Sequence, residues 1–95
     1  MTPFRGNISG TVDSQTYTLP MVINNFTLVN MTGGAVGFGV YLIKDARSVM
    51  IAPFGDTIAA NEKYTDELPR VLEIGEKIRL ATGGSVDYDF ELDNI

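Results

Sequence analysis

The fold class is indicated most clearly by residues 77–93, which read KIRLATGGSVDYDFELD. Residues 77–80 and 85–93 alternate between polar and apolar side chains, and this period of two is typical of strands with one buried face. The intervening residues 81–84, Ala-Thr-Gly-Gly, have the composition of a hairpin turn. The segment therefore predicts two antiparallel strands joined by a short turn.

In such a hairpin, residues that face each other lie on the same side of the sheet. The predicted apolar pairing sets Ile78 and Leu80 against Val86, Tyr88 and Phe90. A loop of odd length, three residues with a left-handed glycine, satisfies this pairing. Arg79 then faces Asp87 or Asp89, and Lys77 faces Asp89 or Glu91. The hairpin would thus neutralise part of the acidic side of its last strand.

A second hairpin is predicted upstream, with strands at residues 22–30 and 35–43 around a turn at 31–34. Its core face would hold Phe26 and Leu28 together with Val36, Phe38, Val40 and Leu42. Gly37 and Gly39 fall on the opposite face, near Tyr41. Glycines at such positions mark close approach by a large ring of the same chain or by a neighbouring subunit. The sequence leaves both readings open.

The remaining sequence also divides into short extended segments. Asp56 could cap a helix over residues 57–68, but the even spacing of the apolar residues there favours an extended segment. Further strands are predicted at 7–12, 16–19, 49–52 and 70–73, with turns at 13–15, 44–48, 53–56 and 74–76. Seven or eight short antiparallel strands predict an all-β fold, a single antiparallel, jelly-roll-like β-sandwich domain over residues 1–95.

Composition excludes several classes of function. The 95 residues leave room for one domain, and the absence of cysteine and histidine removes disulfides, thiolate metal sites and histidine-based catalysis. Seven basic residues against twelve acidic ones give a net charge of −5, which disfavours nucleic acid as a partner. No apolar stretch approaches the roughly 20 residues of a membrane span, and residues 1–5 do not begin a signal peptide. We therefore expect synthesis in a cytoplasm and no membrane partner.

Four acids, Asp87, Asp89, Glu91 and Asp93, form an acidic row on one face of the predicted last strand. Their spacing of about 6.6–6.8 Å is too wide for neighbours to bind one calcium ion together. We interpret the row as a solvated or ion-paired face, with contact to a basic partner surface as the alternative. We predict no metal and no cofactor.

Candidate sites for catalysis or sugar binding are sparse. No two carboxylates are singled out as an acid–base pair, so we do not expect an enzyme. Tryptophan is absent, and a sugar-stacking ring would have to come from Tyr17, Tyr41, Tyr64 or Tyr88. Glycosylation acceptor patterns at Asn7, Asn25 and Asn30 are interpreted as chance occurrences in an Asn/Thr-rich β protein.

The segments VLEIGEKIRL (71–80) and SVDYDFEL (85–92) resemble the C-terminal half of small virion proteins of tailed bacteriophages. Residues 27–34, 40–45 and 51–53 also fit, so the resemblance spans roughly residues 22–92. It rests on the order of strands and turns, and it carries over no family site residues. The resemblance implies a capsid-decorating, head-fibre, neck or tail component, present in many symmetric copies and acting by contact.

The function expected from the sequence is therefore that of a non-enzymatic virion structural protein, located in the virion. Other virion proteins and further copies of the same chain, as a homo-oligomer, would be its partners. The predicted contact residues are Gly37, Gly39 and Tyr41 on one sheet, and the acidic row, Asp87, Asp89, Glu91 and Asp93, on another. The alternative function is a β-sandwich module that binds a carbohydrate or a host-surface ligand.

Overall fold

The computed structural model describes residues 4–51 and 57–95, and these form strands and connections without a helix. The eight strands are β1 (Phe4–Asp13), β2 (Met21–Asn30), β3 (Val36–Lys44), β4 (Arg47–Met50), β5 (Thr57–Ile58), β6 (Lys63–Asp66), β7 (Arg70–Leu72) and β8 (Lys77–Asn94). Every pairing between them is antiparallel. The predicted all-β, antiparallel, sandwich-like fold is confirmed.

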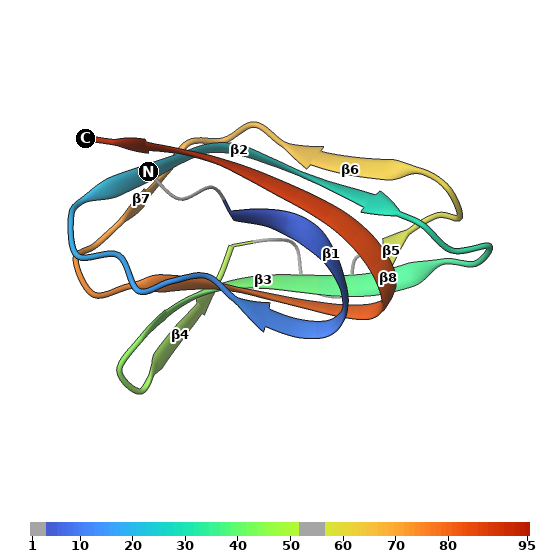
Figure 1. Ribbon diagram of the computed structural model, residues 1–95, viewed down its shortest axis with the longest axis horizontal. Helices are drawn as coiled ribbons and strands as arrows, with labels where there is room; N and C mark the ends of the chain where they lie inside the picture. The colour runs from blue at the N-terminus through green and yellow to red at the C-terminus, as the bar shows by residue number, and fades with distance from the viewer. Residues whose placement is uncertain (1–3, 52–56) are drawn as a thin grey trace.

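The sheet is organised around β8, the longest strand with 18 residues. Its first half pairs with β3, from Lys77 opposite Ile43 to Thr82 opposite Phe38. Its second half pairs with β2, and β1 runs along the other side of β8 on both halves. Figure 1 shows the consequence: β8 bends from the lower layer, beside β3, into the upper layer, beside β2. One curled sheet thereby supplies both layers.

The predicted hairpin at residues 77–93 is wrong, because residues 81–84 continue the strand. At the bend, Ile8 pairs with Val86 and Gly10 pairs with Thr82, so three residues of β8 lie opposite Ser9 alone. The extra residues let β8 turn from one layer to the next. The predicted alternation of buried and exposed residues was correct, since even-numbered apolar residues on both sides of the bend face the core. These are Ile78, Leu80, Val86, Phe90 and Leu92.

The glycines of residues 81–84 have a packing role in place of a turn role. A Cβ on Gly84 would lie 3.0 Å from Val36 Cγ2, which is tighter than ordinary van der Waals contact. The position expected for a Cβ on Gly83 lies 3.8 Å from the Gly37 backbone. Small residues thus allow the bend of β8 to pass close to the start of β3.

The second predicted hairpin has correct strands and incorrect pairing. β2 and β3 match the predicted ranges closely, but each pairs with β8 and neither pairs with the other. They lie in different layers and pack face to face, as Figure 1 shows. The six residues predicted to face the core, Phe26, Leu28, Val36, Phe38, Val40 and Leu42, are all buried.

Smaller differences concern the connections. The predicted strand at 16–19 is absent; residues 14–20 instead run irregularly beside the start of β8, where Tyr17 N donates to Glu76 O at 2.9 Å. β4 begins at Arg47, so the turn predicted at 44–48 shrinks to Asp45 and Ala46, with Asp45 at a left-handed φ of 54°. Residues 57–68 hold β5 and β6 and no helix, as expected. The turn predicted at 53–56 lies outside the described residues.

Buried apolar side chains form one cluster between the layers. Its centre contains the stacked rings of Phe26 and Phe90, whose centroids lie 4.8 Å apart, with Phe4 at 5.1 Å from Phe90. Because Phe4, Phe26 and Phe90 belong to three neighbouring strands, the rings tie β1, β8 and β2 together.

Candidate interaction surfaces

The acidic row lies on the outer face of the second half of β8, flanked by β1 and β2. Neighbouring strands supply a partner to each acid. Asn7 Nδ2 donates to Asp87 Oδ1 at 2.7 Å, and Asn24 Nδ2 donates to Asp93 Oδ2 at 2.7 Å. Asn25 Nδ2 donates to Glu91 Oε2 at 3.4 Å, and Arg5 Nε lies 3.6 Å from Asp89 Oδ1. The row is a polar face held mainly by carboxamides.

The predicted pairing of this row with Lys77 and Arg79 is wrong, because both cations lie on the first half of β8. They bind Asp13, the last residue of β1. Arg79 contacts both carboxylate oxygens, at 2.7 and 3.0 Å, and Lys77 Nζ lies 2.9 Å from Oδ2. The hydrogen bond from Arg79 is the main cause that holds the pKa of the Asp13 carboxyl well below its usual range. Burial opposes this shift, and the hydrogen bond from Lys77 and both positive charges add to it.

Across residues 4–51 and 57–95, no group of three or more Asp or Glu side chains is placed to hold an ion. The described chain also has no helix long and apolar enough to cross a membrane.

The structure places Gly37, Gly39 and Tyr41 on β3, as predicted, and decides between the two readings for Gly39. A Cβ on Gly39 would lie 2.7 Å from Tyr41 Oη, so the tyrosine ring of the same chain covers this glycine. Gly37 is exposed and pairs with Thr57 of β5. A ring of the same chain therefore accounts for Gly39, and Gly37 is left as the accessible member of the set.

Sequence reasoning missed the open edge of β1, which we define as the side of Phe4–Asp13 turned away from β8. Among the described residues, β1 forms ladder pairs with β8 alone. Its alternate residues, Arg5, Asn7, Ser9, Thr11 and Asp13, are all exposed. An edge is a property of sheet order, and the sequence of β1 contains no signal that would distinguish an edge from a central strand.

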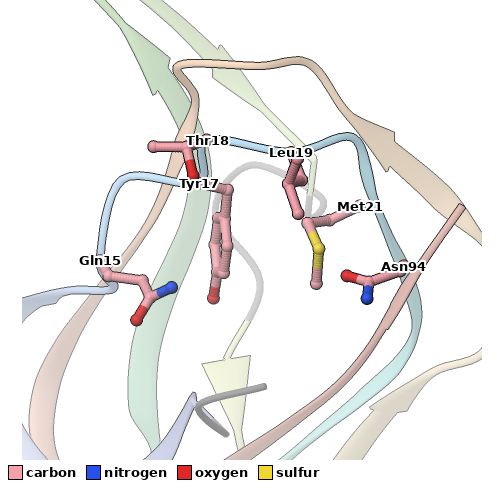
Figure 2. Close-up of a pocket in the computed structure, with 6 residues that line it drawn as sticks. All are labelled: Gln15, Tyr17, Thr18, Leu19, Met21 and Asn94. Atoms are coloured by element: carbon pink, nitrogen blue, oxygen red, sulfur yellow. The ribbon is translucent and has the colours of Figure 1, made fainter.

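A pocket of about 250 Å³ lies beside the irregular segment that leads into β2. Figure 2 shows the Tyr17 ring and the Met21 side chain extending into it, with the carboxamides of Gln15 and Asn94 at its sides. Tyr17 and Met21 are buried, whereas Gln15, Asn94, Thr18 and Leu19 are exposed. The pocket thus has an apolar floor, a polar rim and no charged side chain among these six residues. Burial raises the pKa of the Tyr17 hydroxyl above its ordinary value.

A cluster of ion pairs joins the turn after β3 to the turn before β8. Arg47 Nη2 lies 3.2 Å from Glu73 Oε2 and 3.5 Å from Glu76 Oε2, and Lys44 Nζ lies 3.5 Å from Glu73. Glu76 is buried, and its Oε1 accepts a hydrogen bond from the Glu73 backbone N–H. The cluster ties two connections together, and its partners within the chain account for each of its charges.

Comparison with protein-family models, with curated proteins and with solved structures gave no match. Function is therefore inferred from the residues and geometry of the chain itself.

Proposed function

We propose that this protein is a non-enzymatic structural subunit that acts by protein–protein contact, as a capsid-decorating, head-fibre, neck or tail component of a tailed-phage virion. The observation that carries the proposal is the open edge of β1. An open edge presents unpaired backbone N–H and C=O groups that another strand can pair with. β1 has ten residues, and in the described chain alternate ones turn these groups toward the open edge, while the others pair with β8.

By comparison, the other edge of the upper layer is protected against pairing with another strand. It is formed by β6 and β7, which have four and three residues. Pro69 lies between them and has no N–H to donate. Short strands, proline and charged residues are the devices by which proteins block unwanted edge pairing. β1 has no proline and is the longest open edge among the described strands, so it is the best candidate for a contact between subunits.

The outer faces suit the same role. Because the acids of the acidic row have hydrogen-bond or ion-pair partners in neighbouring strands, the surface is held in one arrangement before any partner binds. A basic surface on another virion protein would complement the row. The exposed Gly37 and the neighbouring Tyr41 offer a second, smoother contact on the lower layer.

Two measurements test this function together. The first is the molar mass of the purified chain by light scattering, where we expect a homo-oligomer. The second is co-sedimentation with assembled tailed-phage capsids, where we expect the chain in the pellet. A strict monomer at high concentration that also stays in the supernatant would contradict the proposal.

The pocket beside Tyr17 favours a second candidate function, a module that binds a neutral carbohydrate. An aromatic and apolar floor suits the C–H face of a sugar ring, and the carboxamides of Gln15 and Asn94 can each donate to and accept from hydroxyl groups. The net charge of −5 disfavours anionic ligands. A volume of about 250 Å³ restricts the ligand to the size of one sugar ring.

NMR titration with a panel of neutral methyl pyranosides at up to about 100 mM tests this second function, since it detects dissociation constants of that order. Carbohydrate binding predicts shifts at residues 15–21 and 94–95 and affinity about fivefold weaker in Asn94→Ala, with Asn7→Ala as an exposed control outside the pocket. No shift with any sugar, or equal losses in the two variants, would exclude it.

A further inference from the structure

We infer that two copies of this chain pair through the open edge of β1, antiparallel, about a two-fold axis at Ser9. Ser9 then faces the partner's Ser9, Asn7 faces the partner's Thr11, and Arg5 faces the partner's Asp13. The inference rests on the proposed function in that it requires self-association, and it names the strand, direction and register of that contact.

The backbone of β1 is oriented for such pairing. Ser14 N donates to Ile78 O at 2.8 Å, so this N–H points toward β8. Because N–H groups of successive strand residues point to opposite sides, those of Asp13 and Thr11 differ in direction from Ser14 and point to the open edge. These two residues are the ones that the register sets opposite Arg5 and Asn7 of the other copy.

Charge decides the register. Within one copy, Arg5 pairs with Asp89 across the sheet, and Asp13 pairs with Arg79. Joining the two edges produces a continuous row across both sheets, which reads Asp89, Arg5, the partner's Asp13 and the partner's Arg79. The signs alternate at every step of this row, and the two-fold axis produces the row twice. Neighbouring opposite charges across paired strands stabilise the pairing.

Arg5 has the freedom to make this contact. Its side chain is 64% exposed, and its ion pair with Asp89 is long at 3.6 Å. Asp89 Oδ1 in turn has no hydrogen-bond partner in the described part of the chain. The guanidinium presents five donors, so it can bridge Asp89 and a second carboxylate.

The inner side of β1 fits the same register. Ile8 faces the partner's Gly10, and Val12 faces the partner's Gly6. Each partly buried apolar side chain therefore lies opposite a residue without a side chain, and no two bulky groups compete for the same space.

Other registers lose the charge pairing. A shift of two residues sets Arg5 opposite the partner's Thr11, or Asp13 opposite the partner's Asn7. Either shift leaves both Arg5 and Asp13 without an opposite charge across the junction. With a net charge of −5 on each copy, an association that lacks such pairs is opposed by repulsion.

Cysteine trapping tests the register directly, because the chain has no cysteine of its own. Facing residues of an antiparallel pair have Cα atoms about 4.5–5.5 Å apart, which a disulfide can bridge. Under mild oxidation, we expect Ser9→Cys to form a disulfide-linked dimer. Asn7→Cys and Thr11→Cys, each alone, are matched controls and are expected to remain uncrosslinked, whereas an equal mixture of the two is expected to form the mixed dimer.

The outcomes separate the inference from the proposed function. If the wild-type chain associates but Ser9→Cys does not cross-link, or if Asn7→Cys or Thr11→Cys alone cross-links as well as Ser9→Cys, the register is wrong and self-association stands. If the wild-type chain is a monomer, both self-association and the register are overturned. Circular dichroism of each variant verifies that it is folded.

Discussion

Asn30 is the buried polar residue that fixes the most backbone. Its Nδ2 donates to the carbonyls of Gly34 at 2.7 Å and Ile58 at 2.8 Å. Its Oδ1 accepts from the backbone N–H and the hydroxyl of Thr32, both at 2.8 Å. The Asn-Met-Thr sequence that matches a glycosylation pattern therefore has a structural role, because one fully buried amide organises the connection from β2 to β3 and the segment after β5.

We expect Asn30→Ala to lower the free energy of unfolding by about 3 kcal/mol, since it leaves several buried polar groups without partners. Asn24→Ala, which removes one exposed hydrogen bond, serves as the control and should cost less than about 1 kcal/mol. Urea unfolding measures both values. Equal losses in the two variants would show that the Asn30 network does not stabilise the fold.

The Asp13 carboxyl gives stability a defined dependence on pH. Its pKa is lowered in the folded state, so its contribution is complete above the unfolded value of about 4 and is lost as pH falls toward the folded value. We expect the stability of the wild type to fall below about pH 4 more steeply than that of Asp13→Asn. Urea unfolding at several pH values measures this difference, and parallel curves would contradict the assignment.

At the scale of elements, β8 shows what local patterns can and cannot predict. The period of two correctly placed Ile78, Leu80, Val86 and Phe90 on the core face. A Gly-Gly pair between two alternating segments is compatible with both a turn and a bend. Pairing with strands distant in sequence determines that residues 81–84 form a bend. β1 pairs with both halves of β8, β3 pairs with the first half and β2 pairs with the second half.

The same reason explains the other differences. The strands at 22–30 and 35–43 were predictable from local alternation, but their assignment to separate layers depends on β8, more than 30 residues away in sequence. The position of the acidic row was likewise predictable from alternation. Its partners Asn7 and Arg5 were not, because they come from β1 at the other end of the chain.

The bend of β8 can be tested with two neighbouring glycines. Gly84→Ala places a Cβ 3.0 Å from Val36 Cγ2, whereas Gly83→Ala meets the Gly37 backbone at an ordinary 3.8 Å. Both changes reduce the entropy of the unfolded chain equally. We therefore expect Gly84→Ala to be less stable than Gly83→Ala by about 1 kcal/mol in urea unfolding. Equal stabilities of the two variants, or the reverse order, would contradict the close packing of Gly84 against Val36.

At the scale of the whole molecule, charge and edge exposure act together. Each copy has a net charge of −5, yet the open edge of β1 carries Arg5 near one end and Asp13 at the other. This arrangement favours close association only where Arg5 of one copy lies opposite Asp13 of the other. The proposed contact is therefore expected to weaken as salt screens the charges.

Arg5→Glu tests this electrostatic contribution. It places like charges at three successive positions of the row, so we expect self-association to weaken by about tenfold or more. Lys63→Glu changes the net charge equally at an exposed residue of β6, which lies on the opposite edge of the upper layer, and should have a much smaller effect. Sedimentation velocity at low salt compares the two variants, and equal effects would mean that net charge alone controls association.

The central claim is that copies of this chain associate with one another by repeated contacts. Light scattering of the wild-type chain over a concentration series tests it most directly. We predict a molar mass that rises with concentration to twice the chain mass of 10.3 kDa or beyond. A molar mass that stays at 10.3 kDa throughout the series would contradict it.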